Sequence, residues 1–176
     1  MSEYEDQLIA QMKRLLLVRG YQWVERAREE NVAQAEAKLG FSLPSLLRRI
    51  YLEVGDGAFG LSPLNREDFN GLCEEDLVDG YLQRRSLTQE AIDLAWEQDE
   101  EKPFVWPEKL LMIYDWGCNI YSCLDCSHSE NRVLRNDNNV SLAACAIETP
   151  SFQQWVQAWL NGTLEFDWNK AEKVTL

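Results

Sequence analysis

The chain has 176 residues, of which 45% are hydrophobic, so it is long enough and apolar enough to bury one substantial core. Its net charge of -13 argues against direct binding to nucleic acid and favours a basic partner, although an acidic surface also serves solubility alone. No apolar run reaches the length of a membrane span, and the acidic start is unlike a signal peptide. We therefore expect a cytoplasmic protein with reduced cysteines.

The N-terminal third of the chain predicts three helices. Apolar spacing indicates a first helix over about residues 2–18. We expect a second helix to begin at Asn31 as its N-cap and to end at Gly40, because glycine tolerates the left-handed conformation that follows a helix. Pro44 lies in the first turn of a third helix. The apolar face of this third helix is formed by Leu47, Ile50, Tyr51 and Val54, and a glycine-rich loop follows over residues 55–60.

The middle of the chain, residues 74–101, is predicted to be helical. One helix is expected over residues 74–85 and a second, capped by Thr88, continues to the acidic run that ends at Glu101. The block contains no proline. We interpret it as an elaboration between the two ends of the domain.

The C-terminal part predicts strands and one closing helix. Residues 110–114 and 120–126 are expected to form a hairpin, with turn residues at Asp115, Trp116, Gly117 and Asn119. A further strand is expected over residues 132–135, and another over residues 140–147, where the alanines would also suit a helix. The last helix is predicted from Thr149, as its cap, to Leu160, with its apolar face formed by Phe152, Trp155, Val156, Trp159 and Leu160. Together these elements predict one α+β domain over residues 1–176, with a mixed or antiparallel sheet of about four to six strands flanked by helices.

The order of short motifs resembles the SUKH superfamily. The pattern A-E-x-x-L-G-x-x-L-P-x-x-L begins at Ala35 and is followed by the Ile50-Tyr51 pair and by Gly55-Asp56-Gly57; Ser151 opens a closing S-F-x-x-W-x-x-x-W-L-x-G. The resemblance covers about residues 30–162. That superfamily includes a yeast cell-wall synthesis regulator and many bacterial toxin-immunity proteins. It implies a binding protein rather than an enzyme.

Three cysteines and the single histidine raise the question of a metal. A Cys-x-x-Cys pair is a common zinc half-site, but a second half-site is missing, and Cys123 and Cys126 face opposite sides of the predicted strand. Buried, reduced thiols and a loop histidine are the interpretation we favour, and no cofactor is expected. The set comprises Cys118, Cys123, Cys126 and His128.

Other chemistry is not indicated by the sequence. It contains no G-x-S-x-G elbow and no phosphate-binding loop, and nothing orients a Cys–His nucleophilic pair. Oxygen side chains near the strands do not have EF-hand spacing, and we interpret them as turn formers rather than cation ligands. These are Asp115, Asn119, Asp125, Asp137 and Asn138. No enzyme is expected.

Clustered carboxylates are the candidate functional residues. They form either a solvated helix face or a surface that plugs the basic cleft of a partner such as a nuclease. The acidic set is Glu74, Glu75, Asp76, Asp79, Glu97, Asp99, Glu100 and Glu101, and Trp96 and Trp106 are the candidate aromatic anchors beside it. With the resemblance, the leading hypothesis is an intracellular immunity protein that blocks a toxin's active site. A regulatory scaffold module is the alternative, and an enzyme comes third.

Overall fold

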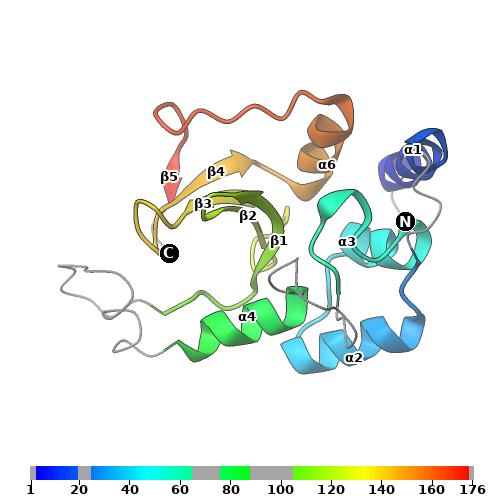
Figure 1. The fold of residues 1–176 in the computed structure, drawn as a ribbon, viewed down its shortest axis with the longest axis horizontal. Helices are drawn as coiled ribbons and strands as arrows, with labels where there is room; N and C mark the ends of the chain where they lie inside the picture. The colour runs from blue at the N-terminus through cyan, green and yellow to red at the C-terminus, as the bar shows by residue number, and fades with distance from the viewer. Residues whose placement is uncertain (1–2, 20–24, 65–75, 88–104, 175–176) are drawn as a thin grey trace.

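Figure 1 shows a computed structural model of the chain, which describes residues 3–19, 25–64, 76–87 and 105–174. Five antiparallel strands form one sheet in the order β1-β2-β3-β4-β5, so each strand pairs with its neighbours in the sequence. The strands are β1 (Leu110–Gly117), β2 (Ile120–Asp125), β3 (Val133–Asp137), β4 (Cys145–Thr149) and β5 (Lys173–Val174).

Helices surround this sheet. In Figure 1, α6 lies above the sheet, α4 lies below it, and the three N-terminal helices pack beyond one end. The predicted α+β class and the antiparallel sheet are therefore confirmed. In the described ranges, no helix is long and apolar enough to cross a bilayer. The helical elements are α1 (Glu3–Arg19), α2 (Glu29–Leu39), α3 (Ser45–Arg49), the π-helix η1 (Ile50–Val54), the 3₁₀ turn η2 (Ala58–Gly60), α4 (Leu77–Ser86) and α6 (Phe152–Asn161).

The caps of α2 and α3 differ in detail from the predictions. Asn31 is not the N-cap of α2; it is the third helical residue, and its Oδ1 accepts a hydrogen bond from the backbone N–H of Arg28 (3.2 Å). The amide oxygen thus satisfies a free N–H from inside the first turn. Gly40 ends α2 with a φ of 80°, as predicted. Pro44 stands just before α3, where its carbonyl accepts the N–H of Arg48 (3.0 Å).

The first hairpin turn is shorter than predicted. Asp115 and Trp116 are not turn residues, because β1 continues to Gly117, which pairs with Ile120. Only Cys118 (φ 52°) and Asn119 (φ 60°) remain between the strands. Positive φ at both central positions is what a two-residue turn needs to match the twist of its strands.

The C-terminal elements are shifted along the chain. The predicted strand over residues 140–147 begins only at Cys145, because Val140 and Ala144 donate their N–H groups within turns (3.1 Å each). Thr149 ends β4 and does not cap α6; the cap is Ser151, whose Oγ accepts from the N–H of Gln154 (3.3 Å). After Gly162 the chain runs back along the sheet as a tail, residues 163–174, which contains the unpredicted strand β5.

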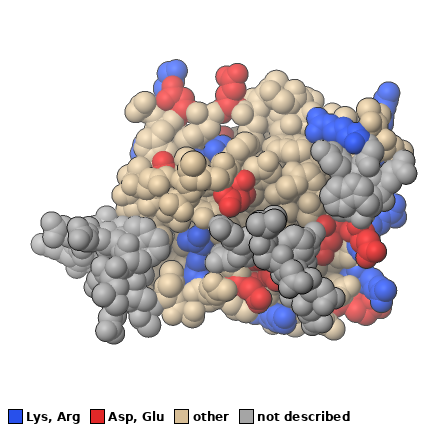
Figure 2. All heavy atoms as spheres, in the orientation of Figure 1, with Lys and Arg blue, Asp and Glu red and all other residues tan. Residues whose placement is uncertain are grey.

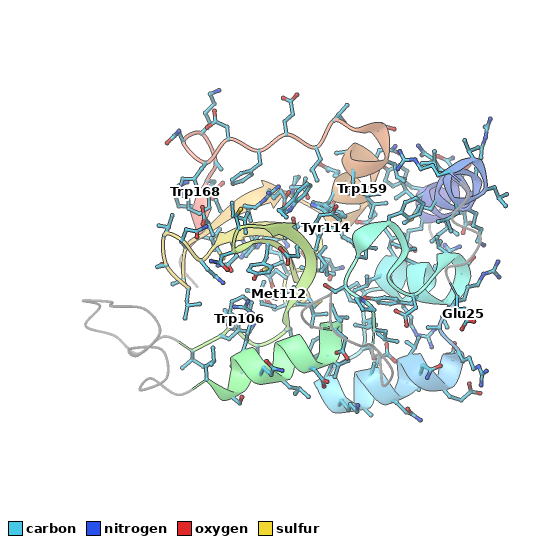
Figure 3. The ribbon with its side chains drawn as sticks, in the orientation of Figure 1. Glu25, Trp106, Met112, Tyr114, Trp159 and Trp168 are labelled. Atoms are coloured by element: carbon cyan, nitrogen blue, oxygen red, sulfur yellow. The ribbon has the colours of Figure 1, made fainter. Side chains whose placement is uncertain are left out.

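The core lies between the helices and the sheet. Tyr51 is 1% exposed, and its hydroxyl donates to the carbonyl of Ser62 (2.7 Å). The ring of Tyr114 in β1 contacts those of Trp155 and Trp159 in α6, with centroid distances of 5.9 and 6.5 Å. Figure 3 shows Tyr114 and Trp159 together on the α6 side of the sheet. Gly60 is needed beside Tyr114, since its φ is +79° and an added Cβ would lie 3.1 Å from the Tyr114 ring.

Candidate partner-binding surface

Helix α4 is held in place by one buried face and by bonds at both ends. Leu77, Val78 and Tyr81 are buried, and the Tyr81 ring meets Phe41 of the α2–α3 loop edge-on at 5.8 Å. The N–H of Leu77 donates to the carbonyl of Pro63 (2.8 Å). At the other end, Arg85 donates from Nη1 to the carbonyl of Trp106 (2.5 Å). The opposite face of α4 is therefore presented on a fixed support.

The exposed residues of α4 and of the adjoining chain combine carboxylate, amide and apolar groups. Leu82 and Leu87 are 39% and 38% exposed, and Val105, which precedes Trp106, is 63% exposed. Exposed apolar side chains beside polar ones are typical of surfaces that dock another protein. We call this set the α4 surface; it comprises Asp76, Asp79, Leu82, Gln83, Ser86, Leu87 and Val105.

Two of the predicted acidic residues lie on the α4 surface. Asp76 is the N-cap of α4, and its Oδ1 accepts from the N–H of Asp79 (2.7 Å), so the structure brings this pair together. The pair also stands at the positive end of the helix dipole. The other members of the predicted set lie outside the described residues: Glu74, Glu75, Trp96, Glu97, Asp99, Glu100 and Glu101.

The negative charge of the chain is unevenly distributed. Residues 65–75 and 88–104 carry ten of the thirty acidic side chains but only two of the seventeen basic ones, which accounts for eight of the thirteen net negative charges. These two segments join the described chain at the two ends of α4. The ten residues of α4 are about 15 Å long. The charge excess therefore lies in the two segments that border α4 in the sequence.

Elsewhere the described surface is closer to balance. Many of its basic side chains form ion pairs. On the face shown in Figure 2, red and blue atoms lie next to one another along the right and lower edges. Arg49 alone reaches Asp6 and Glu53 at 2.8 and 2.7 Å, which raises the pKa of Arg49 and lowers that of Glu53 through their mutual hydrogen bond. Other pairs are Lys13–Glu53, Arg48–Glu29, Arg85–Glu108, Arg132–Asp125 and Lys170–Asp167.

Trp106 is not on the surface. Its side chain is 2% exposed, and its indole N–H donates to the carbonyl of Leu110 (2.9 Å). Figure 3 places Trp106 between α4 and the sheet. Sequence position beside an acidic run suggested an exposed anchor, but the packing of α4 over the start of β1 buries this ring.

The four cysteines that the structure describes are free thiols, and three of them are buried or half-buried. Burial raises the pKa of Cys123 well above its ordinary value and the pKa of both Cys126 and Cys145 to about 12, so these groups are protonated at neutral pH. Cys123 is fully buried, whereas Cys118 and His128 lie in exposed turns. Among the residues that the structure describes, no three of His, Cys, Asp and Glu are grouped to hold a metal ion.

Three aspartates near the ends of strands accept hydrogen bonds from the N–H groups two residues further on; Asp125 and Asp137 do so where turns begin, as predicted, whereas Asp115 does so within β1. Asp137 accepts from the N–H of Asn139 (3.0 Å), and Asp115 accepts from that of Gly117 (2.6 Å). Asp125 accepts from the N–H of Ser127 (3.1 Å) and pairs with Arg132 (2.9 Å). Burial of Asp125 opposes its ionisation, but the hydrogen bonds from Ser127 and Arg132 outweigh burial and lower its pKa.

One arginine cluster that the sequence did not reveal lies on the α6 side of the sheet. Arg135 is stacked between Trp116 and Phe166, with its guanidinium carbon 4.4 and 4.9 Å from their ring centroids. It pairs with Glu148, whose side chain is fully buried. Glu148 also accepts from the hydroxyl of Ser122 (2.5 Å), which in turn accepts from the indole N–H of Trp116 (2.8 Å). The cluster is thus a hydrogen-bonded ion pair, in which the Nε of Arg135 is buried without a hydrogen-bond partner among the described residues.

A second arginine cluster lies on the α4 side. Arg84 is stacked between Trp106 and Tyr121, with its guanidinium carbon 4.9 and 5.1 Å from their ring centroids. In the described part of the chain, no carboxylate lies within ion-pair distance of it, and its Nε is buried without a hydrogen-bond partner. Its members come from three separate elements, so no sequence pattern could have assembled them.

The comparison with known families gives one match. The model of the SMI1 / KNR4 family (SUKH-1) matches residues 26–157, which are three quarters of the chain. The matched range runs from just before α2 into α6. The resemblance seen in the short motifs is confirmed. No curated protein matches the chain. Helix α1 and the tail lie outside the matched range.

Proposed function

This chain belongs to the SMI1 / KNR4 family (SUKH-1), and from that premise we propose that it is an intracellular immunity protein that binds and neutralises a toxin. The partner we propose is a basic toxin domain, such as a nuclease. The mechanism is blockade: the α4 surface and the acidic segments beside it cover the toxin's active site and present carboxylates where its substrate would present phosphates.

The observation that carries the proposal is the excess of negative charge in the two segments that border α4 in the sequence. A nuclease must hold a polyanion, so its active site is lined by cations. Carboxylates opposite those cations speed the encounter and exclude the substrate by like-charge repulsion. The exposed side chains of Leu82, Leu87 and Val105 add apolar contact area to the charged groups. Burial of this area against the partner slows dissociation of the complex.

The first test is capture of partners from the source organism's lysate at low and at high salt, with identification by mass spectrometry. A single basic effector that is retained at low salt and weakened at high salt supports the proposal, because exposed charge pairs are screened by salt. Inhibition of that effector's activity by the purified protein then completes the test. Capture of housekeeping proteins in place of an effector favours a regulatory scaffold module.

A charge-reversal variant locates the surface. Reversal of Glu97, Asp99, Glu100 and Glu101 to lysine should weaken the complex with the captured effector at least tenfold, mainly through slower association. The matched control reverses four exposed carboxylates on other parts of the molecule, Glu3, Glu130, Glu165 and Glu172, with the same change in net charge. Equal loss in both variants would show a general charge effect, and unchanged affinity in the first would remove this segment from the interface.

A further inference from the structure

We infer that Arg84, between Trp106 and Tyr121, forms a binding site for a carboxylate from outside the chain. The inference needs no toxin and stands apart from the immunity proposal. It rests on an incomplete copy of an arrangement that the molecule completes elsewhere. On the α6 side, Arg135 has two aromatic rings and Glu148; on the α4 side, Arg84 has two aromatic rings and, among described residues, no acid.

The guanidinium of Arg84 is fixed but still reachable. The guanidinium carbon lies over both rings, and the Nε is buried. The side chain of Arg84 is partly exposed, and its buried atom without a partner is Nε, not either Nη. The outer edge of the guanidinium, which carries the two Nη groups, therefore reaches solvent. The Nη N–H groups are therefore the donors that a ligand would use.

Carboxylate is the ligand that suits this edge. A guanidinium presents parallel N–H donors that match the two oxygens of a carboxylate, and such charge-assisted bonds are stronger than neutral ones. The rings lower the local dielectric around the cation, which strengthens an ion pair that forms there. Arg135 gives an example of this chemistry in the same molecule, since it pairs with Glu148 while its guanidinium carbon lies over the Trp116 ring.

Among the described residues, the charged neighbours of Arg84 have other partners. Arg85, the next residue, already bonds to the carbonyl of Trp106 and to Glu108 (3.3 Å). Asp115 is the register partner of Tyr121 on the same face, but its Oδ1 accepts the N–H of Gly117. The amide of Asn136, the next register partner, has its Oδ1 buried without a donor from the described residues. A protonated or hydroxyl-bearing ligand could use that acceptor, whereas the carboxylate itself belongs on Arg84.

The test is an NMR titration of the ¹⁵N-labelled protein with sodium acetate at constant ionic strength. The signals to follow are the Trp106 indole N–H and the Arg84 Nε–H, assigned through Trp106→Phe and Arg84→Gln. A saturable shift of both signals, with a Kd of the order of millimolar, is expected for a single carboxylate. Arg84→Gln should weaken binding at least tenfold, and Arg84→Lys should not restore it, because lysine lacks the planar fork. Arg85→Gln is the matched control and should leave Kd within twofold.

Two further probes distinguish the source of the carboxylate. Ac-Ala-Asp-Ala-NH₂ offers a side-chain carboxylate, and Ac-Ala-Ala-Ala-OH offers a chain terminus; tighter binding of either than of acetate identifies the form preferred. Inorganic phosphate that binds tenfold more tightly than all three would overturn the assignment to carboxylate. Absence of a saturable shift at 100 mM acetate, or an equal shift in Arg84→Gln, would overturn the site itself.

Discussion

On each face of the sheet the guanidinium carbon of an arginine lies over a tryptophan ring and over another aromatic ring, but only one of the two arginines pairs with a described carboxylate. Arg135 has Glu148 and a hydroxyl behind it, so its charge is neutralised inside the fold. Arg84 has the rings but no carboxylate among the described residues. Stacking alone fixes the position of a cation without compensating its charge, and the difference separates a structural ion pair from a place where a ligand can bind.

Removal of the carboxylate from the complete site should have the largest effect. Glu148→Gln keeps the shape but leaves Arg135 charged and buried, so we expect a loss of about 3–5 kcal/mol in the free energy of unfolding, measured by urea denaturation. Glu130→Gln, in an exposed turn, should change stability little. A double variant in which Arg135 and Glu148 both become leucine should recover most of the loss, because no unpaired charge remains. A loss below about 1 kcal/mol in Glu148→Gln would show that Arg135 is not desolvated.

Loss of the Asp125–Arg132 ion pair, at the rim of the sheet, should reduce stability by an intermediate amount. The pKa of Asp125 is lowered in the folded state, below the ordinary value of about 3.9. The ionised carboxylate therefore contributes stability above about pH 4, and this stability is lost as the pH falls through the folded pKa. Asp125→Asn should cost about 1–2 kcal/mol at pH 7 and flatten the decline in stability between about pH 4 and pH 2. Urea titrations across that range measure both effects. An acid decline equal to that of the parent protein would assign it to other carboxylates.

Substitution of one ring in the complete site should have a smaller effect. Trp116→Phe removes the indole N–H that Ser122 accepts and weakens the stacking on Arg135, and we expect a loss of about 1 kcal/mol. The comparison variant is Tyr4→Phe on α1, which should be neutral. Thermal and urea unfolding would measure both. A loss as large as that of Glu148→Gln would mean that the ring, rather than the carboxylate, holds Arg135 in place.

The smallest effect is expected at the incomplete site. Arg84→Met loses two ring contacts but also removes a cation with no acid beside it, so stability should change by less than about 1 kcal/mol at pH 7. Arg135→Met, which strands Glu148, should cost at least about 3 kcal/mol in the same urea experiment. Equal costs for the two methionine variants would remove the distinction between the sites.

Periodic patterns predicted most of the fold. The apolar repeats of α1, α3 and α6 and the strand runs of β1 to β3 appear close to their expected places, because one buried face is a local property of the sequence. Caps were less predictable. Asn31 and Thr149 both suit an N-cap, but the paths of the preceding chain gave that position to Arg28 and Ser151.

The candidate sites were predicted only in part. Carboxylates are visible in the sequence, and Asp76 and Asp79 do share the start of α4. Burial of Trp106 and the stacking of Arg84 and Arg135 depend on which elements meet across the sheet, and no spacing along the chain encodes that. The pairing of β4 with a two-residue β5 was too short to leave a pattern.

Strand β5 and the segment at residues 61–62 cover the two edges of the sheet and protect it from self-association. At one edge β5 pairs with Cys145 and Ala146, and the N–H of Ile147 donates to the carbonyl of Glu172 (2.8 Å). At the other edge Leu61 bridges to Tyr114, and Ser62 donates to the carbonyl of Ile113 (2.9 Å). Open strand edges are templates for aggregation, so these few bonds limit the growth of the sheet from one copy to the next.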